Sequence, residues 1–278
     1  MKPNPSRSAP LSVNPQLNTQ PKLSVILPCA GEGRRLGASG PKELHEAEPG
    51  IPLIQYSLDL LMQTPPELAA KTQVVVVIRS GKESVVSRVI EQLEGTVMRV
   101  VAVSFDPELH EWPGSIHSAR EHFSESNVVL LPDSFLVLSS LDRSAWLRRG
   151  VRVTLLEGMI EALSYHSLVF GVKRSHDEAE LRQFGALMLD EDARVSGLQD
   201  KPTDVRAFNA IWCCLGFQRS IAGELHPMLM QSLTSRLHEN MCGHSACFPA
   251  GSIDVQEYFD LGTPERIERF LDYRSTTA

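Results

Sequence analysis

Short, β-rich apolar runs alternate with helical patterns through the first half of the chain, and this alternation constrains the fold more than any other feature. Buried strands are predicted at 23–27, 73–79, 97–103 and 127–131, and helices at 52–62, 81–93 and 115–123. Four consecutive valines in 73–79 indicate a strand that is covered on both faces. Such alternation predicts an α/β fold, a three-layer α/β/α sandwich around a mixed, mainly parallel sheet.

The second half is predicted to hold a helix at 151–164, strands at 167–172, 184–189, 194–198 and 207–217, and helices at 220–237 and 264–273. Proline is favoured in the first turn of a helix, where Pro264 would stand. Residues 1–20 are rich in Pro, Ser and Asn and contain no apolar segment. We therefore expect a disordered tail at 1–21, not a secretory signal, and a single domain at 22–278.

The composition excludes several classes of partner. The chain of 278 residues has a formal net charge of -7, whereas a general nucleic-acid binder needs a basic face, so we expect no nucleic-acid partner. No apolar run is long enough to span a bilayer, so we expect no membrane partner. Five cysteines without regular spacing fit reduced thiols and predict a cytoplasmic protein. The oligomeric state stays open, and a homo-oligomer is compatible with the sequence.

A glycine-rich turn follows the first predicted strand, in the segment Pro28-Cys29-Ala30-Gly31-Glu32-Gly33-Arg34-Arg35-Leu36-Gly37. Its glycines at 31 and 33 let the backbone approach a ligand and point N–H groups at it. The two arginines and the nearby Lys42 add positive charge, so the loop suits a polyphosphate. A dinucleotide fingerprint would need glycine at position 36, and a P-loop would need Ser or Thr at position 43, so neither pattern fits.

Two aspartates stand at positions that suit a metal ion. Asp133 follows a predicted strand, at the sheet edge where ligands bind in α/β folds, and could hold Mg²⁺ beside a phosphate. An aspartate there is more often a turn or cap residue. Asp260 precedes Leu261-Gly262-Thr263-Pro264, a segment that also predicts a helix start with Thr263 as N-cap. The residues alone leave both roles open.

Taken in order, these segments resemble the sugar-1-phosphate nucleotidyltransferase family. The loop from Ala30 to Lys42 is similar to the family's A-G-x-G-x-R-L…P-K signature, and 258–264 is similar to its aromatic-x-D-x-G-T-P segment. Weaker similarities follow at 184–187, 200–202 and 208–209. The spacing within the first loop is closer to the related methylerythritol-phosphate cytidylyltransferases, whose members lack the D-x-G-T-P ending. In the first loop, Arg34 stands where the sugar enzymes commonly have a small residue. Departures at Asp200 and Ile211, where the family has Glu and Gly, predict an altered acceptor pocket.

The resemblance implies a Rossmann-like fold and a metal-dependent transfer from an NTP to a phosphorylated small molecule, a sugar 1-phosphate above all, with release of pyrophosphate. A phosphorylated amino alcohol or cyclitol is an alternative acceptor. The implied nucleotide-binding half is 22–140 and the acceptor-binding half is 151–278. Implied roles are nucleotide contacts by Ala30, Gly31, Gly33, Arg34, Gly114 and Ser115, catalytic charge from Arg35, Lys42, Asp133 and Lys201, acceptor contacts by Gly185, Asp200 and Asn209, and Mg²⁺ on Asp133 and Asp260.

Two other functions remain as alternatives. A GT-A-type glycosyltransferase has a similar sheet but usually carries an Asp-x-Asp pair, and Asp133-Ser134-Phe135 lacks the second aspartate. A non-catalytic nucleotide-binding regulatory protein would keep the loop without turnover, and the changes at 200 and 211 are compatible with it. Four residues of metal-binding type, His238, Cys242, His244 and Cys247, match no established zinc spacing, so we expect buried thiols there and no zinc site.

Overall fold

The computed structural model describes residues 20–37, 40–138, 154–238 and 250–277. The predicted tail at 1–21 therefore lies outside the described residues except for its last two positions. So do Cys242, His244 and Cys247, as well as the side chains of Arg34 and His238.

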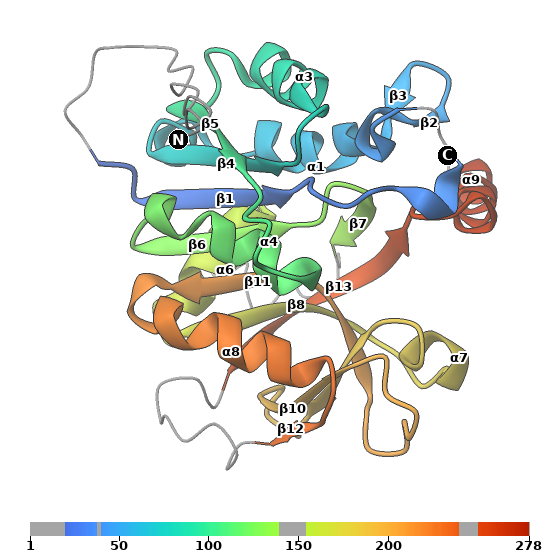
Figure 1. Cartoon of the computed structure of the whole chain (residues 1–278). Coiled ribbons are helices and arrows are strands. Elements are labelled where there is room, and N and C mark those ends of the chain that lie inside the picture. Colours follow the sequence, from blue (N-terminus) through green and yellow to red (C-terminus); the bar gives the residue numbers. More distant parts are fainter. Residues whose placement is uncertain (1–19, 38–39, 139–153, 239–249, 278) are drawn as a thin grey trace, which may run out of the picture.

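An eleven-stranded sheet runs through both halves of the described chain (Figure 1). In its first part, β5 (Arg99–Ser104), β4 (Thr72–Ile78), β1 (Leu23–Pro28) and β6 (Ser126–Leu130) are neighbours in that order, and every pair is parallel. The carboxyl ends of these strands therefore meet at one edge of the sheet.

The second part of the sheet is mostly antiparallel. The path continues from β6 to β11 (Ala210–Gln218), β9 (Gly185–Leu189), β10 (Val195–Asp200) and β12 (Leu237–His238). Off this path, β8 (Leu168–Arg174) pairs with β11, and β13 (Gly251–Asp260) pairs in parallel with β8 and antiparallel with β7 (Ser134–Leu138). A small hairpin, β2 (Glu46–Glu48) with β3 (Ile51–Pro52), lies outside this sheet.

Helices cover both faces of the sheet, which confirms the predicted three-layer α/β sandwich with a mixed sheet. One core contains apolar residues of α1 (Leu53–Met62), α3 (Glu83–Leu93) and α6 (Leu155–Leu163) packed on the strands. The core on the opposite face contains residues of α4 (Glu111–Ser118) and α8 (Ala222–Ser232). The short helices α2 (Pro66–Ala69) and α7 (Glu178–Leu181) lie in connections.

A third, smaller core joins segments that are far apart in the sequence. Leu36 from the glycine-rich loop, Tyr56 of α1, Leu261 after β13 and Phe270 of α9 (Pro264–Thr277) belong to this one buried cluster. Burial of these side chains removes apolar area from water and so holds the loop and the end of β13 together. The packing therefore brings the two segments with the most specific motifs into one region.

Two predicted element boundaries were wrong. The helix predicted at 220–237 ends at Ser232, and Leu237 begins a strand. The helix predicted at 115–123 starts at Glu111, because Pro113 is tolerated in a first helical turn, and it gives way to a 3-10 turn at Arg120–His122. The strands β7 and β13 were not predicted at all.

Candidate active site

The glycine-rich loop is shaped around the side chain of Lys42. This lysine begins a short 3-10 helix, η2 (Lys42–Leu44), which follows the loop. A methyl group at Gly33, where φ is 68°, would lie only 2.8 Å from Cβ of Lys42, and one at Gly31 would lie 3.7 Å from its Nζ. The two glycines therefore let the lysine stem pass along the loop, a reason for glycine that adds to the close approach of a ligand.

Lys42 reaches across the sheet edge to Asp133. Its Nζ donates to Oδ2 of Asp133 over 2.5 Å, and both side chains are largely buried. Burial by itself would lower the pKa of Lys42, but the attraction and hydrogen bond of Asp133 outweigh it, so that this pKa is raised. Asp133 follows β6 and Lys42 follows β1, and these two strands are parallel neighbours. The pair therefore forms where their carboxyl ends meet.

Asp260 lies next to Asp133, as a metal site shared by the two would require. β13 brings it there by antiparallel pairing with β7, which opposes Asp260 to Ser134, and the Leu261 N–H donates to the Asp133 carbonyl over 2.8 Å. A methyl group at Gly262 would lie 2.7 Å from Oδ1 of Asp260 and 3.6 Å from Oδ2 of Asp133. The two carboxylates thus flank one small space that glycine leaves open.

The donor set fits a hard divalent cation such as Mg²⁺, which prefers carboxylate oxygens. Burial raises the pKa of Asp260, and the nearby Asp133 carboxylate raises it further, which means that two like charges are held together at a cost. Arg266 offsets part of this cost by an ion pair with Asp260. No group of three or more His, Cys, Asp or Glu that could hold a metal occurs in the part of the chain that the structure describes. Asp133 and Asp260 would therefore have to share a cation with oxygens of the substrates.

On the other side of the loop, two cations that the sequence analysis missed hold its backbone. The Arg79 Nε donates to the Ala30 carbonyl over 2.8 Å. The Lys82 Nζ donates to the carbonyls of Cys29 and Gly31 and, over 2.8 Å, to both carboxylate oxygens of Glu43. Lys82 and Glu43 are almost fully buried. Because β4 is the neighbour of β1, residues at its carboxyl end could have been expected beside the loop.

The second half of the chain contains a row of three residues on adjacent strands. Asp200 of β10 opposes Gly185 of β9, and Trp212 of β11 packs over the same glycine. A methyl group at Gly185 would overlap the Trp212 indole, with only 1.8 Å to its Nε1. Trp112 of α4 contacts Trp212 in a tilted arrangement, with ring centroids 4.9 Å apart and an interplanar angle of 43°. Gly185, which opposes Asp200, is thus covered by the Trp212 indole, and no sequence motif indicates either indole.

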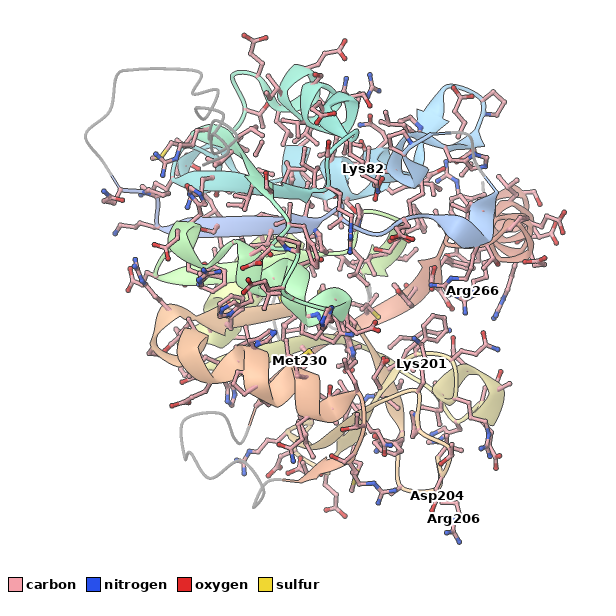
Figure 2. All side chains as sticks on the ribbon, viewed as in Figure 1. Lys82, Lys201, Asp204, Arg206, Met230 and Arg266 are labelled. Carbon is pink, nitrogen blue, oxygen red and sulfur yellow. The ribbon has the colours of Figure 1, made fainter. Side chains whose placement is uncertain are left out.

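Lys201 follows Asp200 and projects into solvent. Its backbone has φ 46°, its N–H donates to the Phe184 carbonyl over 3.0 Å, and its Nζ lies 3.5 Å from Oδ2 of Asp200. Burial raises the pKa of Asp200, and Lys201 opposes that change. The Arg266 guanidinium lies over the Phe184 ring, 4.8 Å from its centroid, so this side is linked to Asp260. Figure 2 shows Lys201 and Arg266 on the side of the molecule toward which β1 runs.

The remaining predicted site residues have structural partners or are exposed. The Asn209 side chain exchanges two hydrogen bonds, of 2.8 and 2.9 Å, with the backbone of Leu189, so it joins strands β9 and β11. Gly114 and Ser115 are buried inside α4, and a methyl group at Gly114 would meet Leu109 at 2.8 Å. Arg35 is exposed on η1 (Arg34–Leu36). Substrate contacts by these residues stay predictions.

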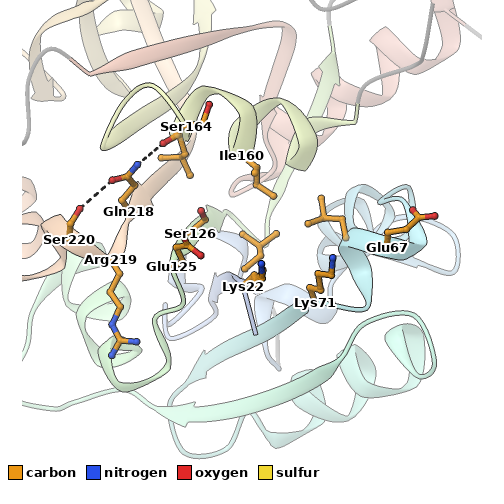
Figure 3. A pocket seen from close by; sticks show the side chains of 13 residues that line it. Lys22, Glu67, Lys71, Glu125, Ser126, Ile160, Ser164, Gln218, Arg219 and Ser220 are labelled. Carbon is orange, nitrogen blue, oxygen red and sulfur yellow. Dashed lines mark hydrogen bonds between the residues drawn. The ribbon is translucent and has the colours of Figure 1, made fainter. Parts of the chain in front are cut away.

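A cleft of about 840 Å³ lies at the opposite ends of the strands (Figure 3). Residues at the beginning of β1 and β6 and at the end of β11 line it, among them Leu23, Ser126 and Gln218. None of the candidate site residues whose side chains the structure describes lines this cleft, so it is separate from the Asp133 region. In the described part of the chain, no helix has the length and apolarity needed to cross a membrane.

No protein-family model and no curated protein sequence matches the chain, but solved structures do. A UDP-glucose pyrophosphorylase complexed with UDP-glucose is 16% identical with a TM-score of 0.63, and the match covers 92% of this chain and 100% of that one. A putative glucose-1-phosphate thymidylyltransferase from Bacillus anthracis is 13% identical with a TM-score of 0.62, over 89% and 93% of the two chains. The inositol-1-phosphate CTP transferase from T. maritima is 14% identical with a TM-score of 0.60, over 94% and 100%. The chain therefore has the fold of the sugar-1-phosphate nucleotidyltransferases, as the glycine-rich loop and the Asp260 segment predict.

Proposed function

We propose that the protein is a nucleotidyltransferase that joins an NTP to a phosphorylated small molecule and releases pyrophosphate. The main support for the proposal is that Lys42, Asp133 and Asp260 lie together beside the glycine-rich loop. Proteins of the same fold include pyrophosphorylases and transferases whose names contain a sugar or inositol phosphate. A sugar 1-phosphate or cyclitol phosphate is accordingly the first class of acceptor to test.

In this reaction, an oxygen of the acceptor phosphate attacks the α-phosphorus of the NTP in line with the departing pyrophosphate. Both reactants are anionic, so the barrier is largely electrostatic, and fixed cations lower it by offsetting repulsion. Lys42 and Arg35 would neutralise the triphosphate beside the loop, and Lys201 would neutralise the acceptor phosphate. The phosphate is itself a nucleophile, so no side chain has to remove a proton.

Asp133 and Asp260 would hold Mg²⁺ between them. When bound, this ion would withdraw charge from the phosphates and help to align them. Gly262 keeps the space between the carboxylates free. The Asp260–Arg266 ion pair would fix the orientation of the second carboxylate.

The test is to incubate the purified protein with Mg²⁺, each of the four NTPs and a panel of phosphorylated acceptors, and to measure pyrophosphate. The panel would contain hexose 1-phosphates, inositol phosphate and phosphorylated amino alcohols. We expect pyrophosphate with one NTP and one acceptor class, and its loss by at least 100-fold in Asp133→Asn and Asp260→Asn. Transfer from a sugar nucleotide without pyrophosphate from any NTP would contradict the proposal.

A further inference from the structure

Three consecutive backbone carbonyls in the glycine-rich loop receive hydrogen bonds from cations. The carbonyl of Ala30 accepts from Arg79, and the carbonyls of Cys29 and Gly31 accept from Lys82. Both cations come from the segment that follows β4. Arg79 and Lys82 thus fix the orientation of three consecutive peptide groups directly after β1.

This arrangement decides where the N–H groups point. In a planar trans peptide, the N–H of one residue is directed opposite to the carbonyl of the residue before it. The N–H of Ala30 therefore points away from Lys82, which binds the Cys29 carbonyl, and the N–H of Gly31 points away from Arg79, which binds the Ala30 carbonyl. Neither donates to another residue of the described chain, although Ala30 is only 2% exposed. Adjacent N–H groups without a protein acceptor are available to bind an oxygen atom of a ligand.

The two cations are themselves held firmly. The Arg79 guanidinium lies over the Phe105 ring, 4.4 Å from its centroid. Lys82 is 8% exposed, and its charge is matched by Glu43, which is 0% exposed. Glu43 adjoins Lys42 in η2, so the same buried ion pair ties the loop to the lysine that contacts Asp133.

We propose that Arg79 and Lys82 are positioning residues for the nucleotide: by holding the carbonyls of Cys29, Ala30 and Gly31, they present the N–H groups of Ala30 and Gly31 to an oxygen of the NTP. The inference rests on the proposed function. It assigns no contact between these two cations and the substrate. Their loss should therefore weaken NTP binding and leave the acceptor's KM unchanged.

The first variant is Arg79→Met, which removes one carbonyl contact and leaves no buried charge unpaired. Its matched control is Arg99→Met. Arg99 stands on the neighbouring strand at the opposite end of the sheet and donates to Oε1 of Gln73 over 2.8 and 3.0 Å. Calorimetric titration with the preferred NTP should show a Kd about tenfold higher for Arg79→Met and unchanged for Arg99→Met. The two variants should have similar Tm values, and only the first should raise the KM for NTP.

Lys82→Met alone would leave Glu43 buried without a partner, so the second variant is the double substitution Lys82→Met with Glu43→Gln. We expect a folded protein with an NTP Kd raised by more than tenfold and an acceptor KM within about twofold of the original. Unchanged NTP Kd in both the Arg79 and the double variant would overturn the inference. If the unmodified protein binds NTP but forms no pyrophosphate, the transferase proposal fails while the binding data still decide this one.

Discussion

The Nζ of Lys42 lies 2.5 Å from Oδ2 of Asp133, although 91 residues separate them in the sequence. The contact forms because their strands, β1 and β6, are parallel neighbours that end at the same edge of the sheet. Lys42 is held against the carboxylate by a loop whose glycines leave room for its stem. A lysine held in this way is fixed before any substrate arrives, as a catalytic cation of the proposed transfer would need to be.

Lys42→Met should lower kcat by about 100- to 1,000-fold, because it removes the fixed cation and leaves Asp133 without its partner. The length and apolar stem of the side chain are retained, so packing along Gly33 is preserved. Pyrophosphate release at saturating substrates measures the effect. Lys71→Met, in the separate cleft at the other end of the sheet, is the control and should keep normal turnover. If the two variants had equal kcat values, Lys42 would have no role in the chemical step.

Gly262→Ala should weaken Mg²⁺ activation with little effect on stability. The added methyl group would lie 2.7 Å from Oδ1 of Asp260 and 3.6 Å from Oδ2 of Asp133, so at least one carboxylate must move. We expect the Mg²⁺ concentration for half-maximal activity to rise by about tenfold, which corresponds to about 1.4 kcal/mol. Gly223→Ala, where nothing lies within 4 Å of the added methyl, is the control. An unchanged Mg²⁺ dependence would show that the carboxylates do not share a metal ion.

Much of the fold could be predicted from sequence because its first half is regular. Apolar runs such as β4 (Thr72–Ile78) are buried on both faces, and their composition and length favour a strand over a helix. The strand β13 was not predicted because its alternation of apolar and polar residues is short: it is broken by the register shift between Val255 and Glu257. It is a strand because its pairing with β7 and β8 satisfies its backbone.

The site was predictable only where a motif carries it. Asp133 and Asp260 could be proposed from their segments, but their proximity depends on the pairing of β7 with β13, which no local pattern indicates. Arg79 and Lys82 belong to no sequence motif, and their contacts with the loop arise because β4 is the neighbour of β1. The contact of the Trp212 indole with Gly185 is known only from the structure, because no sequence pattern indicates it. Composition and periodicity do not indicate which distant strands pair with each other, and the site depends on that pairing.

Gly185→Ala should impair use of the acceptor more than use of the NTP. The new methyl group would lie 1.8 Å from Nε1 of the Trp212 indole, so the ring must move away from residue 185, which opposes Asp200. We expect a loss of about 1–3 kcal/mol in unfolding free energy and a several-fold higher KM for the acceptor at unchanged KM for NTP. Gly185→Ala combined with Trp212→Val restores the space, so its unfolding free energy should recover while its acceptor KM stays high. Recovery of both would mean that the indole acts in packing alone.

The neighbouring histidines His117 and His226 should make stability depend on pH. Their rings lie 4.6 Å apart between α4 and α8, and Nε2 of His226 is buried without a hydrogen bond to the described residues. Burial lowers the pKa of both side chains, and for His117 the neighbouring His226 and then Arg120 lower it further. The unfolded chain, with an ordinary histidine pKa of about 6.5, therefore binds protons more readily than the folded protein.

Because the unfolded chain binds protons more readily, lowering the pH destabilises the folded protein. The contribution of the pair to the free energy of unfolding is fully present at pH values above the unfolded pKa. It is lost as the pH falls below that value toward the lower pKa values of the folded protein. Urea denaturation between pH 7.5 and 5.5 should show this loss, and its size should be below about 1 kcal/mol because solvent screens the half-buried rings. His226→Gln removes one titrating ring and the repulsion that acts on the other, so its stability should fall less over the same interval. A steeper fall for that variant than for the unmodified protein would mean that the histidine pair does not cause the pH dependence.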